Sequence, residues 1–470
     1  MEETNIEWSV YRKIIWDYIN AVNTQMNIVP ISYKFLSAQM ITESKKMKQF
    51  SKDHGTPFKD EGGEGIRMSL EHGAVFEKMK KNLNNTARAI DITGENAVIG
   101  LVSKFDGYLG ILTKQIFTDK PEILNGSDKE FRVSDILTYR DFDELKDVLV
   151  EKEIETLLRK NHVDQLQWLE TKLGIELRKF KLLPEYVEIM ERRNLFVHCN
   201  GVVSRQYMSE CKKFGVDLPE DVKPGETLDA YVKYVRKAYK VLFQVGVMLG
   251  FTLWYKIRPQ EGLEMIDSLS EVAYDLIKDG AHDLGLDIID YALSNKSWAK
   301  EIKAAQQLVF RINKALAFHL RDMQDECEKI VDSIDVTAAE LRYHLAVAVL
   351  RNEYDDAYDI MGRIGKDGEM RVNYKIWPLF YKIRREPAFI DKFKEIYNEE
   401  YECTDTRTAF EEVIKSAMEM VEKTKEMMDK KENAGGQEVQ EADAEVVEEE
   451  MTTQKMKQEE SDVKGSDKEE

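Results

Sequence analysis

The chain has 470 residues, 43% of them hydrophobic and 33% charged, which is the composition of a globular protein with room for roughly two to four domains. It contains only nine prolines and 25 glycines, which excludes collagen-like, low-complexity and turn-dense all-β chains. The 68 basic and 88 acidic residues give a net charge of −20, which argues against a protein that coats DNA non-specifically.

Residues 1–95 are predicted to be an N-terminal helical and loop segment. The first 13 residues are acidic and lack the apolar core of a signal peptide, whereas residues 8–18 carry apolar side chains at helical spacing. The stretch from Asp53 to Gly65 is rich in glycine, but it lacks the Gly-Lys-Ser/Thr ending of a phosphate-binding loop, and no apolar strand precedes it. We interpret this stretch as a surface loop.

Residues 96–258 show helical periodicity in every long segment, so we expect an all-α bundle there. Apolar stripes predict helices around residues 98–116, 149–158 and 166–173, and Pro184 is placed where another helix would begin. Residues 228–257 are predicted to form one long helix. Its second half is apolar all round, which suits the centre of a bundle.

One segment of this bundle combines residue types suited to chemistry on a phosphodiester. Arg193 is followed by Asn194 and, after three apolar residues, by His198. An imidazole titrates near neutral pH and can move the proton of a ribose 2′-hydroxyl that attacks the neighbouring phosphorus. A guanidinium can stabilise the charge of the pentacoordinate phosphate. Because Asn194 lies four residues before His198, its amide would be able to bond and orient the imidazole on a helix.

This Arg-Asn-x-x-x-His pattern, with Pro-Glu-Tyr-Val-Glu-Ile-Met-Glu-Arg before it and Gly-Val-Val-Ser after it, resembles the signature of HEPN domains (higher eukaryotes and prokaryotes nucleotide-binding). The resemblance covers about a third of the chain. It implies a helical bundle that dimerises and a metal-independent endoribonuclease in which Arg193, Asn194 and His198 are catalytic. Members of the family commonly act as toxins or in abortive-infection and antiphage defence, and some lack catalysis and serve as binding modules.

The spacing of the motif poses a geometric problem. Arg193 and His198 are five residues apart, which places them roughly 140° apart around an ideal helix. Residues 199–201 (Cys-Asn-Gly) are typical of a helix end, so His198 would be able to approach Arg193 from a loosened last turn. Alternatively, two copies of the motif face one another across a two-fold axis, as the resemblance implies, with Val197 at the contact.

Basic residues near the motif are candidates for binding the RNA backbone. We expect this role for Arg192, Arg205, Lys212 and Lys213, because phosphate contacts supply most of the attraction to nucleic acid. Any one such residue is more often part of a solvated helix face.

Residues 259–428 show signs of internal repetition. Leu320-Arg321-Asp322 and Leu350-Arg351-Asn352 are offset by 30 residues, and small or apolar residues recur 12 apart in each unit. The pairs with this spacing are Ala273/Gly285, Ala315/Cys327 and Leu345/Ala357. The pattern resembles helix-hairpin repeats of the tetratricopeptide type, in which small residues let paired helices approach closely. It implies a surface for a protein partner; a plain helical bundle is the alternative.

Residues 429–470 are predicted to be a disordered acidic tail. From residue 431 onward there are 14 acidic and five basic residues and no aromatic residue. Such a segment cannot bury enough apolar surface to offset the entropy lost on ordering. Because much of the negative charge lies in this tail, a local basic site elsewhere remains compatible with the net charge.

Other kinds of site are not indicated by the sequence. The four cysteines are widely spaced and include no Cys-x-x-Cys, which favours reduced thiols over disulfides or zinc. The other histidines lack metal-ligand spacing, and no dinucleotide fingerprint is present, so we expect neither a metal nor a cofactor. The longest apolar run, residues 241–255, is shorter than the ~20 residues that span a bilayer. We expect a cytoplasmic protein without a membrane segment.

The sequence therefore predicts an all-α HEPN-like endoribonuclease joined to helical repeats, with RNA as substrate and a homodimer formed through the bundle. The alternative is a non-catalytic adaptor whose bundle dimerises or binds a nucleotide and whose repeats bind a partner protein. A repeat-containing transcriptional regulator is a weaker alternative, because no helix-turn-helix with a basic recognition helix is evident.

Overall fold

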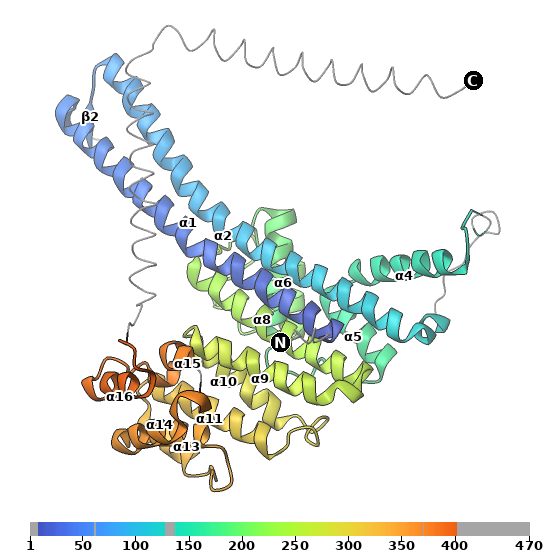
Figure 1. Cartoon of the computed structure of the whole chain (residues 1–470). Helices are drawn as coiled ribbons and strands as arrows, with labels where there is room; N and C mark the ends of the chain where they lie inside the picture. Colours follow the sequence, from blue (N-terminus) through green and yellow to red (C-terminus); the bar gives the residue numbers. More distant parts are fainter. Residues whose placement is uncertain (1–7, 61–62, 127–135, 137, 370, 402–470) are drawn as a thin grey trace, which may run out of the picture. The chain divides into compact units, whose positions relative to one another are not determined.

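The computed structural model describes residues 8–60, 63–126, 136, 138–369 and 371–401 (Figure 1). Apart from one β-hairpin and one isolated β-bridge, the regular secondary structure of these residues is helical, which confirms the predicted all-α fold. The expected acidic tail at residues 429–470 lies outside the described residues. The chain forms two compact units, Met1–Lys382 and Ile383–Glu470, and the described part of the second contains helix α16 (Pro387–Tyr397).

Two long antiparallel helices, α1 (Val10–His54) and α2 (Leu70–Asp119), lie side by side along much of their length (Figure 1). Because α2 runs without interruption from residue 70 to 119, the boundary expected between residues 95 and 96 falls inside a helix. The N-terminal segment is thus part of the bundle rather than an addition to it.

The expected surface loop between these helices is an antiparallel β-hairpin, formed by β1 (Thr56–Asp60) and β2 (Gly63–Arg67). Phe58 pairs with Gly65, and a Cβ atom at residue 65 would lie 2.7 Å from the Phe58 ring. The glycine therefore makes room for an aromatic side chain in the strand pair.

The core of the bundle is α8 (Val232–Ile257), which packs against α1 and α2. Tyr18 and Tyr108 stack with ring centroids 4.2 Å apart. Their hydroxyls donate to the main-chain oxygens of Leu242 at 2.7 Å and Gly246 at 3.0 Å. The predicted long apolar helix is confirmed, although it begins at Val232 rather than at residue 228.

The remaining bundle elements follow α2 in chain order. They are η1 (Pro121–Gly126), α4 (Phe142–Leu158), α5 (His162–Leu173), α6 (Leu183–Cys199) and α7 (Arg205–Lys213). The predicted helices around residues 149–158 and 166–173 correspond to α4 and α5, and Pro184 lies in the first turn of α6 as expected.

After the bundle, the described part of the chain forms three helix hairpins. They are α9 (Gly262–Lys278) with α10 (His282–Ser294), α11 (Ala304–Leu320) with α12 (Gln324–Val331), and α13 (Leu341–Leu350) with α14 (Tyr354–Gly368). The short elements η2 (Pro259–Glu261), α15 (Arg371–Ile376) and η3 (Pro378–Phe380) flank them.

The three hairpins share one turn geometry. Each turn has a left-handed residue, with φ of 83° at Gly280, 59° at Asp322 and 61° at Asn352. The 30-residue offset in the sequence relates the second turn to the third. At Gly285, a Cβ atom would lie 3.3 Å from the main-chain oxygen of Ala273, so the small pair does allow close helix packing. Membership of the tetratricopeptide repeats stays a prediction.

None of the helices in the described part of the chain is both long and apolar enough to cross a membrane.

Candidate active site

Helix α6 carries the predicted catalytic residues and packs against α2, α7 and α8. Its inner face is held by Tyr186, Ile189 and Leu195, all of which are buried. The helix remains regular through Cys199 and ends at Asn200 and Gly201, both in left-handed conformation, where the Gly201 N–H donates to the Leu195 carbonyl. The interpretation that His198 lies in a loosened last turn is therefore wrong. The left-handed cap satisfies a carbonyl at the helix end while the last turn stays regular.

The guanidinium of Arg193 points to α2 rather than to the end of α6. Its Nη2 lies 3.6 Å from Oδ2 of Asp106, and its Nη1 donates to Oδ1 of Asn194 at 3.2 Å. The side chain is 24% exposed, and its Nε is buried without a hydrogen-bond partner among the described residues. Arg193 is thus held in place but remains partly open to solvent.

The same carboxylate holds an imidazole from a third helix. Nε2 of His162, at the first residue of α5, lies 2.9 Å from Oδ1 of Asp106. The imidazole is 11% exposed, and its ring lies edge-on to Tyr186. Asp106 therefore bridges a histidine and an arginine, a combination that can move a proton and stabilise negative charge.

Glu191 adds a second carboxylate to this group. Burial raises the pKa of Glu191, and the nearby Glu210 raises it further, whereas His162 and a hydrogen bond from Asn194 act in the opposite direction. We refer to Asp106, His162, Glu191, Arg193 and Asn194 as the Asp106 cluster.

Asp106 and His162 were not predicted from the sequence. The two residues are 56 positions apart and lie on different helices from Arg193, so no local spacing connects them. Each has the ordinary appearance of a polar residue on a helix. Predicting these two residues from the sequence would require knowing how α2, α5 and α6 pack against one another.

His198 lies in the last turn of α6, and its side chain is exposed together with those of Val197 and Cys199. In the part of the chain that the structure describes, no hydrogen bond or ion pair joins His198 to Arg193 or Asn194. The amide oxygen of Asn194 accepts from Arg193 instead. One copy of the chain thus does not bring the imidazole and the guanidinium of the motif together.

Among the four expected RNA-binding residues, Arg205, Lys212 and Lys213 are exposed on α7, whereas Arg192 is not. Nε of Arg192 donates to Oε1 of Glu188 at 2.7 Å, and the guanidinium lies over the Tyr234 ring, 4.0 Å from its centroid. A largely buried guanidinium that is already paired is unable to take a backbone phosphate without depriving Glu188 of its counter-charge. We therefore exclude Arg192 from the RNA-binding set.

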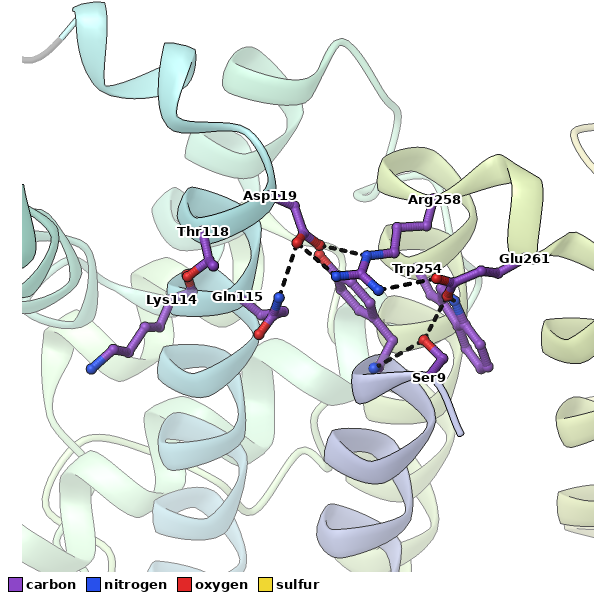
Figure 2. A network of polar contacts seen from close by, with 9 residues as sticks. Ser9, Lys114, Gln115, Thr118, Asp119, Trp254, Arg258 and Glu261 are labelled. Atoms are coloured by element: carbon purple, nitrogen blue, oxygen red, sulfur yellow. Dashed lines mark hydrogen bonds and ion pairs between the residues drawn. The ribbon is translucent and has the colours of Figure 1, made fainter. Parts of the chain in front are cut away.

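A second polar network lies where α1 begins and α2 and α8 end (Figure 2). Arg258 donates two hydrogen bonds to Asp119, at 2.9 and 2.8 Å, and a third to Glu261 at 3.0 Å. Glu261 also accepts from the Ser9 hydroxyl at 2.5 Å and from the Trp254 indole at 2.7 Å. Each charge in this network has a partner, which is typical of a structural tie rather than of a reactive site.

A groove of about 350 Å³ opens among the first helices of the hairpins, α9, α11 and α13, and α15. Aromatic residues Tyr274, Tyr343 and Trp377 and the charged residues Glu271 and Arg342 line it. This mixture of apolar and charged side chains suits a polypeptide better than a small polar metabolite.

In the described ranges, no group of three or more His, Cys, Asp or Glu side chains is placed to hold a metal ion. Comparisons with known proteins give no assignment, since no family model, no curated protein and no solved structure matches this chain.

Proposed function

We propose that this protein is a metal-independent endoribonuclease of the HEPN type. The Arg-Asn-x-x-x-His motif supports the proposal, and one structural observation carries it. Arg193 lies in a partly exposed cluster together with the His162 imidazole, bridged by one carboxylate. Such a cluster contains the two kinds of group that cleavage of a phosphodiester by its own 2′-hydroxyl requires.

In this reaction the 2′-oxygen attacks the neighbouring phosphorus and the bond to the 5′-oxygen breaks. The products end in a 2′,3′-cyclic phosphate and a 5′-hydroxyl. His198 accepts the proton of the 2′-hydroxyl, and Arg193 stabilises the charge that develops on the non-bridging oxygens. Asn194 is a positioning residue for Arg193, because its amide oxygen accepts from the guanidinium.

A second copy of the chain would bring His198 to the site of its partner. Val197 and Val202 are exposed, at 45% and 38%, on either side of the end of α6, so this end offers an apolar surface beside the imidazole. We propose a two-fold dimer through this surface, with Arg205, Lys212 and Lys213 attracting the RNA backbone. A role as a growth-arresting toxin or antiphage effector follows from the resemblance.

The test is cleavage of a fluorescently labelled single-stranded RNA by the full-length protein in excess chelator. We expect products with a 2′,3′-cyclic phosphate, and a decrease in kcat/KM of about 10²–10⁴-fold for Arg193→Ala or His198→Ala. Arg140→Ala and His54→Ala, at exposed positions far from α6 in the chain, are the matched controls. A His198→Ala protein with the wild-type rate would contradict the proposed mechanism.

The second candidate function is a non-catalytic adaptor, which the groove among α9, α11, α13 and α15 favours. Here the bundle dimerises and the groove binds a partner protein. A chain that forms dimers in light scattering but cuts no RNA under these conditions supports the adaptor over the nuclease.

A further inference from the structure

We infer that His162 is a second acid–base residue of the same site and donates a proton to the leaving 5′-oxygen. This inference rests on the proposed ribonuclease function. It concerns a histidine outside the Arg-Asn-x-x-x-His motif, on a helix that the motif does not include.

The position of His162 relative to Arg193 is the first argument. Both side chains contact one carboxylate, with His162 Nε2 2.9 Å from Oδ1 of Asp106 and Arg193 Nη2 3.6 Å from Oδ2. A phosphate bound by the guanidinium is therefore close to the imidazole. Nε2 is engaged by Asp106, which leaves Nδ1 as the ring nitrogen available to a substrate.

The support around the imidazole is the second argument. His162 follows the N-cap residue Asn161 at the start of α5, and its ring lies against the buried Tyr186. An acid–base residue needs this kind of fixed orientation, usually through a carboxylate on its other nitrogen, as Asp106 provides here. His198, in contrast, is exposed in the last turn of α6.

Charged groups on α2 and α6 surround His162. Asp106 on α2 contacts the imidazole directly, Glu191 on α6 interacts with it electrostatically, and Arg193 on α6 shares the Asp106 carboxylate. An imidazole held by a carboxylate beside a phosphate-binding guanidinium is placed to give a proton to a leaving oxygen.

The step balances without any other reactant. The bond between phosphorus and the 5′-oxygen breaks, its electron pair stays on that oxygen, and the oxygen takes the proton of His162. His198 holds the proton taken from the 2′-hydroxyl. Proton exchange with water returns both imidazoles to their starting states.

The experiment compares wild type with His162→Gln on two RNAs, one of them with sulfur in place of the scissile 5′-oxygen. A thiolate leaves without a proton, so it does not need an acid. We expect His162→Gln to lower kcat/KM by about 10²–10⁴-fold on the oxygen substrate and to approach the wild-type rate on the sulfur substrate. The alkaline limb of the pH profile should also disappear, because that limb reports the protonated donor.

His54→Gln, at an exposed position, is the control. If His162→Gln matches wild type on both substrates, or loses the same factor on both, the acid role is overturned.

If His162→Gln does not fold, Asp106→Asn replaces it. We then expect Asp106→Asn to lose more activity on the oxygen substrate than on the sulfur substrate, and an equal loss on both overturns the inference. A wild-type protein that cuts neither RNA instead overturns the proposed function itself.

Discussion

Glu188 explains why one of the arginines beside the motif is structural. Its side chain is only 3% exposed and accepts hydrogen bonds from Arg192 at 2.7 Å, Tyr207 at 2.9 Å and Tyr234 at 2.8 Å. A carboxylate in a protein interior is tolerated only when it is paired and its lone pairs are satisfied, and both conditions hold here. The two adjacent arginines of α6 thus have different roles, since Arg192 pairs with the buried Glu188 and Arg193 belongs to the Asp106 cluster.

We predict that Glu188→Ala destabilises the protein by about 3–5 kcal/mol, because the substitution leaves the largely buried Arg192 guanidinium without its counter-charge. Urea unfolding followed by circular dichroism measures the change. Glu220→Ala, at an exposed position, should change the free energy of unfolding by no more than about 0.5 kcal/mol. A Glu188→Ala protein as stable as wild type would show that this network does not support the fold.

At the scale of one element, α8 shows how glycines adapt a helix to large neighbours. Tyr18 packs against Gly246, and Tyr108 against Gly250, so the hydroxyls of the stacked tyrosines reach main-chain oxygens of α8. Glycine has a low helix propensity, so each glycine makes α8 less stable as a helix. The two buried tyrosines, however, can approach the α8 main chain this closely only where no Cβ is present.

The same substitution should therefore have opposite effects in two helices. Gly250→Ala places a methyl group against the Tyr108 hydroxyl and Ile15, and we expect a loss of about 1–3 kcal/mol. Gly107→Ala in α2 meets no atom within 4 Å, and we expect a gain of about 0.5–1 kcal/mol from its better helix propensity. Thermal unfolding of both variants tests the pair. Equal shifts in Tm would refute the packing argument.

At the scale of the first compact unit, the network around Arg258 joins the beginning of α1 and the ends of α2 and α8 to the start of the hairpins (Figure 2). Burial alone would raise the pKa of Asp119 and of Glu261, but the hydrogen bonds that each accepts, including those from Arg258, lower the pKa of both groups overall. Their contribution to stability is present above the ordinary pKa of a carboxyl group, and it is lost as the pH falls through the lowered values.

We predict that Arg258→Met costs about 1–3 kcal/mol at pH 7, because Asp119 is left largely buried without its partner. The difference from wild type should shrink as the pH falls below the ordinary pKa of aspartate, where the unfolded chain already binds the proton. Urea unfolding at pH 7 and pH 3 measures both effects. Arg140→Ala, in an exposed pair with Glu144, is the control. A difference that does not depend on pH would contradict this account.

The helical architecture was predictable because its signals are local. Apolar spacing located α4, α5 and most of α8, Pro184 marked the start of α6, and the 30-residue offset corresponds to two successive hairpins. The β-hairpin after α1 was not predicted, because its five-residue strands alternate too little to be distinguished from a glycine-rich loop.

The sequence by itself determined which segments are helices, where several of them end, and which residue types in α6 suit phosphodiester chemistry. Only the tertiary structure decided that Arg192 pairs with the buried Glu188, that Arg193 faces Asp106, and that His162 shares this carboxylate. The physical reason is the distance along the chain over which each kind of interaction acts. Helix periodicity and caps depend on residues a few positions apart, whereas these contacts join side chains from separate helices, and their positions depend on how the whole bundle packs.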